Sequence, residues 1–513
     1  MKKCALFILC LISLVSIGQQ VSYFNNIYSN NGNNTKGFSI IDDGSAYTGY
    51  GLTTNPNVYQ LFYFYKYSYS GELLEFKTFY EPYHDYYAGN VGGAMKSEAD
   101  GTYYFTYYLD YNGETYGRLM KMDQNLDTIW TKYYLTEHLW TMPVNSNKTS
   151  DNGYILSGSV KPEEGSFWDF LLLKTDSMGN EQWHQTFGTD WSEHGQNAIQ
   201  TPDGGYLIGG YFWKPGTDHS LDAMVVKTDS LGNEQWTKYF GNPAIDDDMA
   251  FVQMADDGNY LVATVYGEEI ITPDERRGRV AIMKIDTLGN LISIHKFGPN
   301  KIANHIKNFK NNNGSYIASG FYYMNDELFF KGWALNTSTE IDSIWMKGYA
   351  YFNEADDRNY LYDIIATSDN GYAAIGSANV GFTPSNMWII KTDSMGCDTP
   401  GCATGTWVRQ ISPSGGGRGE VLQIWPNPAK DQVTLSLYCP PKQSTGGWKC
   451  AAGRENKGTI SIYDLQGIKT KEISIQPNTE TLSINLETWP SGLYFLQLTV
   501  NGKAVGSAKV VVE

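Results

Sequence analysis

The sequence is poor in basic residues and in long apolar runs. Lys and Arg number 38 against 55 Asp and Glu, so the 513-residue chain carries a formal net charge of −17. Phosphate recognition needs clustered Lys and Arg, and the sequence has no such cluster. We therefore expect neither nucleic acid nor an anionic membrane as a partner. Beyond the N-terminal segment no apolar run approaches ~18 residues, so no membrane span is expected.

The sequence also lacks the patterns that mark catalysis. Its seven histidines form no HExxH motif and no close pair, so we expect them to pack or to lie on the surface; they are His84, His138, His184, His194, His219, His295 and His305. There is no GxSxG, and no Ser or Cys has a motif-defined base partner. The few arginines of the repeat region do not form the carboxylate-binding set of a sialidase. These absences predict no catalytic residue, no metal site and no cofactor, and favour a protein that is not an enzyme.

The one long apolar run lies at the N-terminus. Two lysines precede an apolar stretch from Ala5 to Ile17, and small residues follow before Gln19. This is the pattern of a secretory signal peptide, so residues 1–18 are predicted to be removed on export through the periplasm. A lipoprotein acceptor at Cys10 is the alternative, but Cys10 lies inside the apolar stretch.

Cysteine is scarce, and four cysteines remain after the signal peptide. They form two pairs that are close in sequence, Cys397 with Cys402 and Cys439 with Cys450. In an exported protein such pairs predict two small disulfide loops, with free thiols as the alternative. A zinc site is disfavoured because the pairs lie in different segments with no His nearby.

Glycine and tyrosine are plentiful, and they belong to an internal repeat. Lys227–Trp236 reads KTDSLGNEQW and is nearly identical to Lys174–Trp183, KTDSMGNEQW. A second marker reads DNGY or DGGY, and its turn glycine recurs seven times, about 55 residues apart. The position of the first lysine of the KTDSLGNEQW motif also recurs seven times at about this spacing. The glycines are Gly44, Gly101, Gly153, Gly204, Gly258, Gly314 and Gly371, and the lysine positions are Lys66, Lys121, Lys174, Lys227, Lys284, Asn336 and Lys391.

Each period is predicted to hold four strands. In one copy they are Asn197–Pro202, Tyr206–Phe212, Asp222–Thr228 and Glu234–Phe240, joined by Asp-Gly turns and one longer loop. Four strands every ~50 residues is typical of a β-propeller blade. The KTDSLGNEQW motif is then a hairpin between the third and fourth strands, with a Trp that packs between blades. We predict an all-β chain with a seven-bladed propeller of four-stranded blades.

The ends of the repeat region suggest how the propeller closes. The seventh unit lacks a fourth strand after Gly396, whereas a strand-like segment, Val21–Tyr28, precedes the first unit. We predict that this N-terminal strand completes the last blade and removes an exposed edge. The propeller is assigned to residues 19–402, a flexible Gly- and Ser-rich linker to 403–419, and a small β-sandwich to 420–513.

Candidate ligand-binding residues are the aromatic side chains of the long loops between the second and third strands. They are Trp168, Tyr211, Trp213, Tyr322 and Tyr323. Exposed rings at these places could stack on sugar rings or on peptide, with ordinary packing at the blade edge as the alternative. The acidic runs Asp246–Asp248 and Asp356–Asp357 join successive units, and we expect solvated loops there rather than a Ca²⁺ site.

The C-terminal ~95 residues resemble the type IX secretion system type A sorting domain of Bacteroidetes. Three ordered motifs carry the resemblance: Trp425–Ala429, with Pro426, Asn427 and Pro428; Ile462–Gly467, with Asp464 and Gly467; and Trp489–Tyr494, with Gly492 and Tyr494. The resemblance implies an immunoglobulin-like sandwich that is read by the outer-membrane translocon. It also implies cleavage by a sortase-like peptidase, with release of the cargo or attachment to surface lipopolysaccharide. The insertion from Cys439 to Lys457 and the weakly basic tail depart from the family pattern and put the processing in doubt.

The repeat region is similar to the propellers that precede such sorting domains. Its Asp-x-x-Gly-x-x-x-Trp spacing also resembles the repeats of quinoprotein propellers and the Asp-box of sialidases. We expect a secreted or cell-surface protein that binds or adheres without catalysis, with glycan or protein as ligand. A glycan-active hydrolase or lyase and a structural spacer are the alternatives.

Overall fold

The computed structural model describes most of residues 23–399 and several strands between residues 421 and 512. Outside the description are residues 1–22, 56–57, 80–84, 88–92, 112, 137–139, 214–220, 243–244, 246, 273–274, 325–328, 400–420, 426–429, 439–457, 464–468, 476–480, 501–502 and 513. The predicted signal peptide and linker lie there. All regular elements of the described part are strands, which confirms the all-β prediction. Within that part, no helix has the length and apolarity needed to cross a membrane.

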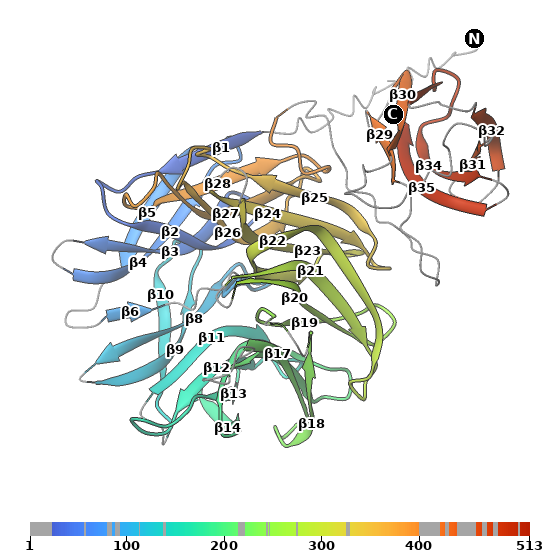
Figure 1. Cartoon of the computed structure of the whole chain (residues 1–513). Coiled ribbons are helices and arrows are strands. Elements are labelled where there is room, and N and C mark those ends of the chain that lie inside the picture. The colour runs from blue at the N-terminus through green and yellow to red at the C-terminus, as the bar shows by residue number, and fades with distance from the viewer. Residues whose placement is uncertain are drawn as a thin grey trace, which may run out of the picture.

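The strands before residue 393 pair mainly in successive antiparallel groups of four (Figure 1). The first group consists of β2 (Thr35–Asp42), β3 (Tyr47–Asn55), β4 (Val58–Tyr67) and β5 (Leu73–Phe79). The second consists of β7 (Met95–Ser97), β8 (Tyr103–Tyr111), β9 (Glu114–Met122) and β10 (Thr128–Tyr134), with β6 (Asp85–Tyr87) also beside β8. The third consists of β11 (Trp140–Lys148), β12 (Tyr154–Lys161), β13 (Asp169–Thr175) and β14 (Glu181–Phe187).

The pattern continues through the second half of the repeat region. The fourth group consists of β15 (Ser192–Gln200), β16 (Tyr206–Trp213), β17 (Leu221–Thr228) and β18 (Glu234–Phe240). The fifth joins β19 (Phe251–Met254), β20 (Tyr260–Thr272), β21 (Glu275–Ile285) and the first half of β22 (Leu291–Asn311). The sixth joins the second half of β22 to β23 (Ser315–Met324), β24 (Phe329–Ser338) and β25 (Ser343–Tyr349). The seventh consists of β26 (Arg358–Ala366), β27 (Tyr372–Asn379), β28 (Asn386–Thr392) and β1 (Phe24–Tyr28).

The last of these groups combines the two ends of the repeat region. β1 pairs antiparallel with β28 from Phe24↔Lys391 to Tyr28↔Met387, and Trp388 Nε1 donates to Asn25 Oδ1 at 2.6 Å. The prediction that an N-terminal strand supplies the missing fourth strand is therefore confirmed. In Figure 1 the groups follow one another around the molecule, so that the first and the last lie side by side, and β2 contacts β26, β27 and β28.

Single parallel residue pairs join some neighbouring groups. Trp140 pairs with Thr115, and Phe330 pairs with Arg358, so that several groups merge into larger sheets of open strand order. The arrangement is propeller-like, while the count of seven closed blades stays a prediction.

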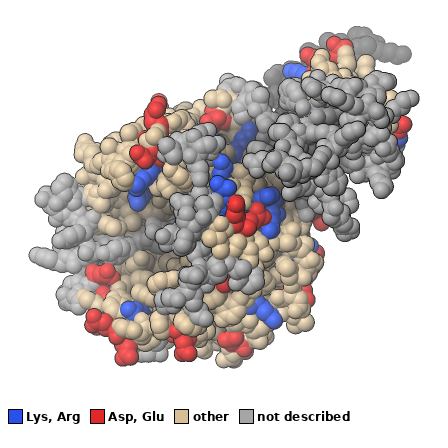
Figure 2. Space-filling model, in the orientation of Figure 1, with Lys and Arg blue, Asp and Glu red and all other residues tan. Residues whose placement is uncertain are grey.

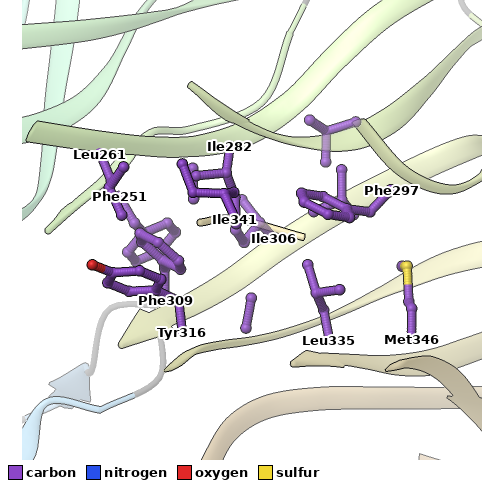
Figure 3. Close-up of a cluster of buried hydrophobic side chains, with 14 of the residues drawn as sticks. Phe251, Leu261, Ile282, Phe297, Ile306, Phe309, Tyr316, Leu335, Ile341 and Met346 are labelled. Atoms are coloured by element: carbon purple, nitrogen blue, oxygen red, sulfur yellow. The ribbon is translucent and has the colours of Figure 1, made fainter. Parts of the chain in front are cut away.

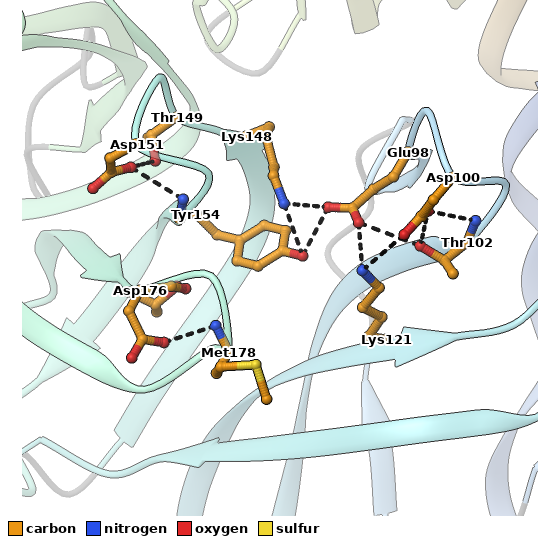
Figure 4. Close-up of polar contacts among 12 residues, drawn as sticks. Glu98, Asp100, Thr102, Lys121, Lys148, Thr149, Asp151, Tyr154, Asp176 and Met178 are labelled. Carbon is orange, nitrogen blue, oxygen red and sulfur yellow. Dashed lines mark hydrogen bonds and ion pairs between the residues drawn. The ribbon is translucent and has the colours of Figure 1, made fainter.

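The two sequence markers of the repeat meet in an ion pair. Lys227 Nζ, on β17, donates to Asp203 Oδ2 at 2.8 Å and to the carbonyl oxygen of Thr228 at 2.7 Å. The same pair recurs as Lys174–Asp151 at 2.7 Å, Lys284–Asp257 at 2.6 Å and Lys391–Asp369 at 2.9 Å. In the second group Glu98 accepts from Lys121, and also from Lys148 and Tyr154 of the third group (Figure 4). In five of the seven units the lysine of one marker therefore pairs with a carboxylate from the turn of the other.

The hairpin of the first marker links neighbouring groups. Asp229 Oδ1 accepts hydrogen bonds from Leu231 N and Asn233 N, both at 2.9 Å, which closes the turn. Gly232 has φ +83°, and a Cβ there would lie 2.6 Å from Trp183 Cζ3 of the preceding group. Equivalent approaches are Gly179 to Trp130, Gly289 to Trp236 and Gly396 to Trp345. Only glycine fits both the backbone and the close contact. The prediction that this Trp packs between units is confirmed.

Replacing Lys227 with methionine should lower the free energy of unfolding by about 1–3 kcal/mol, because it leaves the Thr228 carbonyl without its donor and Asp203 without its cation. Asp203 is partly exposed and stays hydrated, which limits the loss. Chemical unfolding followed by Trp fluorescence measures the effect. Lys238→Met, at a partly exposed lysine on β18, is the control and should change stability by less than about 0.5 kcal/mol. Equal stability of the two variants would contradict the structural role of the marker.

Buried apolar clusters lie between successive groups. The largest joins the fifth and sixth groups and includes Phe251, Ile282, Ile306, Tyr316 and Leu335 (Figure 3). Another joins the first and seventh groups, where Ile40 and Tyr63 meet Ile375 and Ile389. Because each group buries its faces on both neighbours, stability depends on the whole series.

The C-terminal strands form two antiparallel sheets. One has the order β29 (Val421–Trp425), β30 (Gln432–Tyr438), β33 (Thr481–Asn485), and the other β32 (Lys469–Ile475), β31 (Gly458–Tyr463), β34 (Gly492–Val500), β35 (Lys503–Val512). One buried cluster combines Val433 and Leu435 of the first sheet with Ile460, Leu496 and Val510 of the second. Apolar side chains shared by two sheets are typical of a small sandwich.

Candidate functional site

The first strand of five groups is interrupted by a β-bulge at the same place. The register shifts between Gly37 and Ser39 in β2, Pro143 and Asn145 in β11, Gly195 and Asn197 in β15, Ile306 and Asn308 in β22, and Leu361 and Asp363 in β26. We call the skipped residues the bulge residues; they are Phe38, Val144, Gln196, Lys307 and Tyr362. Bulges re-aim side chains and are common beside functional sites.

The bulge residues meet across group boundaries. The rings of Phe38 and Tyr362, from the first and seventh groups, lie 4.9 Å apart. Val144, from the third group, packs against the cluster of the fifth and sixth groups. Lys307 is the only charged side chain of the five, and it is 7% exposed.

The residues that follow the bulges form polar links between groups. Asp363 Oδ2 accepts from Ile40 N at 3.0 Å and Ser39 Oγ at 3.2 Å, and its Oδ1 accepts from Lys310 Nζ at 2.6 Å. Asn197 bridges in the same way, with its Oδ1 accepting from Val252 N and its Nδ2 donating to Val252 O, both at 2.9 Å.

A buried lysine of the second group lies beside these links. Lys96 Nζ donates to Asn145 Oδ1 at 2.9 Å and to Asn147 Oδ1 at 2.7 Å. Burial and the neighbouring charge of Lys310 lower the pKa of Lys96 to about 7. These contacts satisfy the polar groups and identify a structural network.

The residues that precede the bulges are aromatic in three groups. His194 on β15, His305 on β22 and Tyr360 on β26 each lie one residue before the register shift, at the end of the strand that faces the long loops. The His194 ring is stacked on Tyr211 at 4.9 Å and lies 5.7 Å from Trp168. Two of the five predicted ligand residues therefore meet around a histidine.

These rings belong to a longer series. Trp140 lies 6.1 Å from Trp168, Phe321 lies 4.9 Å from His305, and Phe321 lies 4.5 Å from Tyr360. We call this series the aromatic arc; it comprises Trp140, Trp168, His194, Tyr211, His305, Phe321 and Tyr360. All seven side chains are half-buried.

Asp248 contacts the aromatic arc at His305. Its Oδ2 accepts from Ile306 N at 2.8 Å, and its Oδ1 lies 3.4 Å from His305 Nδ1. Burial, reinforced by the charge of Asp248, raises the pKa of Tyr211 to about 12. Burial alone lowers the pKa of His194 to about 4, so its ring is neutral at pH 7.

The expectation of solvated acidic loops is wrong for three of the aspartates. Asp247 and Asp248 are buried, and Asp357 is 1% exposed. Asp247 accepts from Gly267 N at 2.6 Å and Asn242 N at 2.7 Å, and Asp357 accepts from Glu354 N at 2.8 Å. Backbone N–H groups compensate the burial of these carboxylates, which the sequence pattern does not reveal.

The remaining predicted ligand residues are not members of the aromatic arc, although Tyr323 reaches it through Phe330, whose ring centre lies 5.5 Å from that of Tyr360. Trp213, at the end of β16, is 45% exposed. Tyr323 packs against Phe330 with ring centres 5.1 Å apart. The expected exposure is wrong for Tyr322, which is 8% exposed and lines a 260 Å³ cavity with Trp333 and Met346.

A larger cavity of 470 Å³ lies beside the fifth group. Its lining includes Glu268 and Lys296, and Glu268 accepts from Lys296 Nζ at 3.0 Å. Arg279 Nε lies 3.0 Å from the same carboxylate. The charges are thus matched within the cavity, and Figure 2 likewise shows acidic and basic side chains next to each other on the face it displays. Among the described residues no group of three potential ligands could hold a metal ion.

The predicted disulfides and most of the sorting motif fall on residues outside the description. Cys397 is buried, but Cys402, Cys439 and Cys450 are not described, so both pairings stay predictions. Of the motif residues, Pro426, Asn427, Pro428, Asp464 and Gly467 are not described. Gly492 begins β34, and Tyr494 is buried with its hydroxyl donating to Pro490 O at 2.9 Å.

Comparison with known families assigns the C-terminal domain. Residues 423–513 match the model of the secretion system C-terminal sorting domain, which confirms the resemblance drawn from the three motifs. The chain therefore carries a tail for export to the cell surface or beyond, and this tail implies contact with the secretion machinery. No curated protein matches the chain.

Solved structures that resemble the chain are remote in sequence and include propellers. The β-propeller domain of the Trilobed protease from Pyrococcus furiosus is 7% identical, with 72% of this chain and 94% of that one covered and a TM-score of 0.40. Polysaccharide lyase Uly1 is 9% identical, with 74% and 94% covered and a TM-score of 0.42. PorZ, a surface component of the type-IX secretion system of Porphyromonas gingivalis, is 10% identical, with 95% and 70% covered and a TM-score of 0.32.

Sequence reasoning missed His194, His305, Asp248 and Lys307. A signal for them exists, because His194 and His305 each stand three residues before an Asn that follows a bulge. Superposing the seven units on those polar residues would have placed both histidines at one position. Nothing in the sequence shows that the bulges turn Lys307 inward.

Proposed function

We propose that this protein is an exported seven-bladed β-propeller that binds carbohydrate on its loop face without catalysis. In this proposal the first strands surround the propeller axis, and the C-terminal domain is an immunoglobulin-like sandwich. The translocon reads that domain, and a sortase-like peptidase removes it before the propeller is released or attached to the surface. The cell-surface location places the loop face where extracellular glycans are available.

The observation that carries the proposal is the stack of Trp168, His194 and Tyr211. Sugar rings present an apolar face of C–H groups that packs on aromatic rings, while their hydroxyls need nearby polar partners. The aromatic arc offers half-buried rings from several groups of strands, and Asp248 and Ser159 supply polar atoms beside the histidines. Because these rings lie on strands, except for Trp168, which directly precedes β13, the surface is largely preorganised, which lowers the entropic cost of binding.

Alanine at Trp168 or Tyr211 should weaken glycan binding at least tenfold, since each removes a ring worth about 1.4 kcal/mol or more. A glycan array on the full chain identifies the ligand, and calorimetry with that ligand measures the loss. Trp213→Ala is the matched control, because Trp213 is an exposed aromatic of the same strand outside the arc. We expect the Trp213→Ala variant to bind the glycan with the affinity of the wild type. Binding that is lost only in Trp213→Ala would contradict the assignment to the arc.

A glycan-active hydrolase or lyase is the second candidate. The observation that favours it is the contact of His305 with the buried carboxylate of Asp248, since perturbed titratable groups often mark active sites. Release of new reducing ends or unsaturated products from a bound glycan would establish turnover and overturn the non-enzymatic proposal. A structural spacer is indicated if no glycan or protein binds and the variants behave as the wild type.

A further inference from the structure

Lys307 is a buried cation without a hydrogen-bond partner among the described residues. Its side chain is 7% exposed, and the contact that its ammonium makes is with the face of Phe321, whose centre lies 5.5 Å from Nζ. Burial lowers the pKa of Lys307, while the charge of Asp248 acts in the opposite direction. The described residues give this ammonium no hydrogen-bond acceptor, so an acceptor supplied by a ligand would stabilise it.

The nearest carboxylate does not satisfy this lysine. Asp248 Oδ2 already accepts a hydrogen bond from Ile306 N at 2.8 Å, and Asp248 Oδ1 lies 3.4 Å from His305 Nδ1. The other buried lysines of the described part, Lys174, Lys227 and Lys391, each pair with an aspartate and donate to a backbone carbonyl. Lys310, three residues further along β22, donates to Asp363 at 2.6 Å. Lys307 therefore differs from the other buried lysines. The charge of Asp248 attracts its ammonium, but no described residue accepts a hydrogen bond from it.

Further positive charge lies at the same end of the first strands. Lys36 stands one residue before the bulge of β2, and its pKa is lowered by burial and by the charge of Arg358. Arg358 begins β26, two residues before Tyr360 of the aromatic arc. The carboxyl of Glu193, next to His194, is neutralised in part, because burial raises its pKa to about 7. Three cationic side chains, Lys36, Lys307 and Arg358, thus belong to the first strands of three groups, with the carboxylate of Asp248 acting on Lys307.

We propose that the aromatic arc takes an acidic saccharide, whose rings stack on the arc while its carboxylate or sulfate group binds the ammonium of Lys307. This inference rests on the proposed carbohydrate binding and adds the class of ligand. The anion supplies the hydrogen-bond acceptor that the described residues do not give the ammonium, and the charge-assisted hydrogen bond forms beside a largely buried side chain. Stacking alone would accept neutral and acidic sugars alike, so the lysine determines the preference.

The test compares polysaccharides that share a backbone and differ in charge. Pectate against fully methyl-esterified pectin isolates the carboxylate, and carrageenan against its desulfated form isolates the sulfate. We expect the full-length wild type to bind the acidic member of one pair at least tenfold more tightly, with a preference that falls as NaCl rises. Lys307→Met should lose that preference and retain the weaker binding of the neutral member.

Two comparisons separate this role from a structural one. A buried lysine that is kept for binding lowers the stability of the ligand-free protein. Lys307→Met should therefore unfold at the same Tm as the wild type or at a higher one. Lys310→Met, which breaks the link to Asp363, should unfold at a lower Tm and keep the acidic preference. A lower Tm of Lys307→Met with its preference intact would overturn the inference. Equal binding of both members of each pair by the wild type would also overturn the inference. This comparison needs only the wild type, so it tests the inference even if Lys307→Met does not fold. If the wild type binds no saccharide at all, the proposed function fails as well.

Discussion

Asp363→Ala should lower the free energy of unfolding by about 3–5 kcal/mol, a larger loss than that expected for Lys227→Met. The carboxylate is fully buried and joins three groups of strands, through Lys310 of the sixth group, β26 of the seventh, and Ser39 and Ile40 of the first. Removing it leaves the Lys310 ammonium and the Ile40 N–H without their acceptor inside the protein. The Ile40 N–H stays buried, so water does not replace its lost acceptor, whereas the Lys310 side chain is 24% exposed and keeps part of its hydration.

Thermal and chemical unfolding of the full chain measure this effect. Asp363→Asn keeps an acceptor for Ile40 N but removes the charge that faces Lys310, so its loss should be intermediate. Asp190→Ala, at an exposed aspartate between β14 and β15, is the control and should stay within about 0.5 kcal/mol of the wild type. If Asp363→Ala were as stable as Asp190→Ala, the polar link between the first and last groups would not contribute to closure.

The local features of the fold could be predicted from the sequence because their causes are local. An Asp that accepts from backbone N–H groups, a Gly with positive φ and a Trp at a fixed offset define the turn around Asp229. The same chemistry recurs in most units, so repetition alone predicts the number of strands per unit and the missing strand of the last one. The sorting tail is recognisable for a similar reason, since its motifs are contiguous in sequence.

The candidate site could be predicted only in part. Trp168 and Tyr211 are predictable because aromatic residues in long loops stand out, but Tyr322, which has the same appearance, is buried between sheets. Exposure depends on neighbours that are distant in sequence, and no pattern within one unit reports it. His305 and Asp248 meet across 57 residues, and the bulge that turns Lys307 inward leaves no mark in the alternation of polar and apolar residues.

Replacing residues 23–28 with a Gly-Ser segment of the same length should convert much of the protein into aggregates. β1 covers the outer edge of β28 along five residue pairs, and without it the backbone of Met387–Lys391 would be an unpaired edge beside apolar side chains. β1 also reaches the first group, because Phe24 packs 6.3 Å from Tyr47 and Asn26 Nδ2 donates to Gly71 O at 2.9 Å. The lost burial of Phe24 and Ile27 alone corresponds to roughly 3 kcal/mol or more.

Size-exclusion chromatography and the unfolding temperature report this loss, and a peptide in trans tests its cause. A synthetic peptide of residues 23–30 should restore monomer and raise the unfolding temperature if pairing with β28 is the missing element. A peptide with proline in place of Asn26 is the matched control, because proline disrupts strand pairing. Full stability of the substituted protein without peptide would mean that contacts between β2 and β26–β28 hold the first and last groups together unaided. The polar link through Asp363 would then carry the closure, and combining the strand substitution with Asp363→Asn would unfold the chain where each change alone does not.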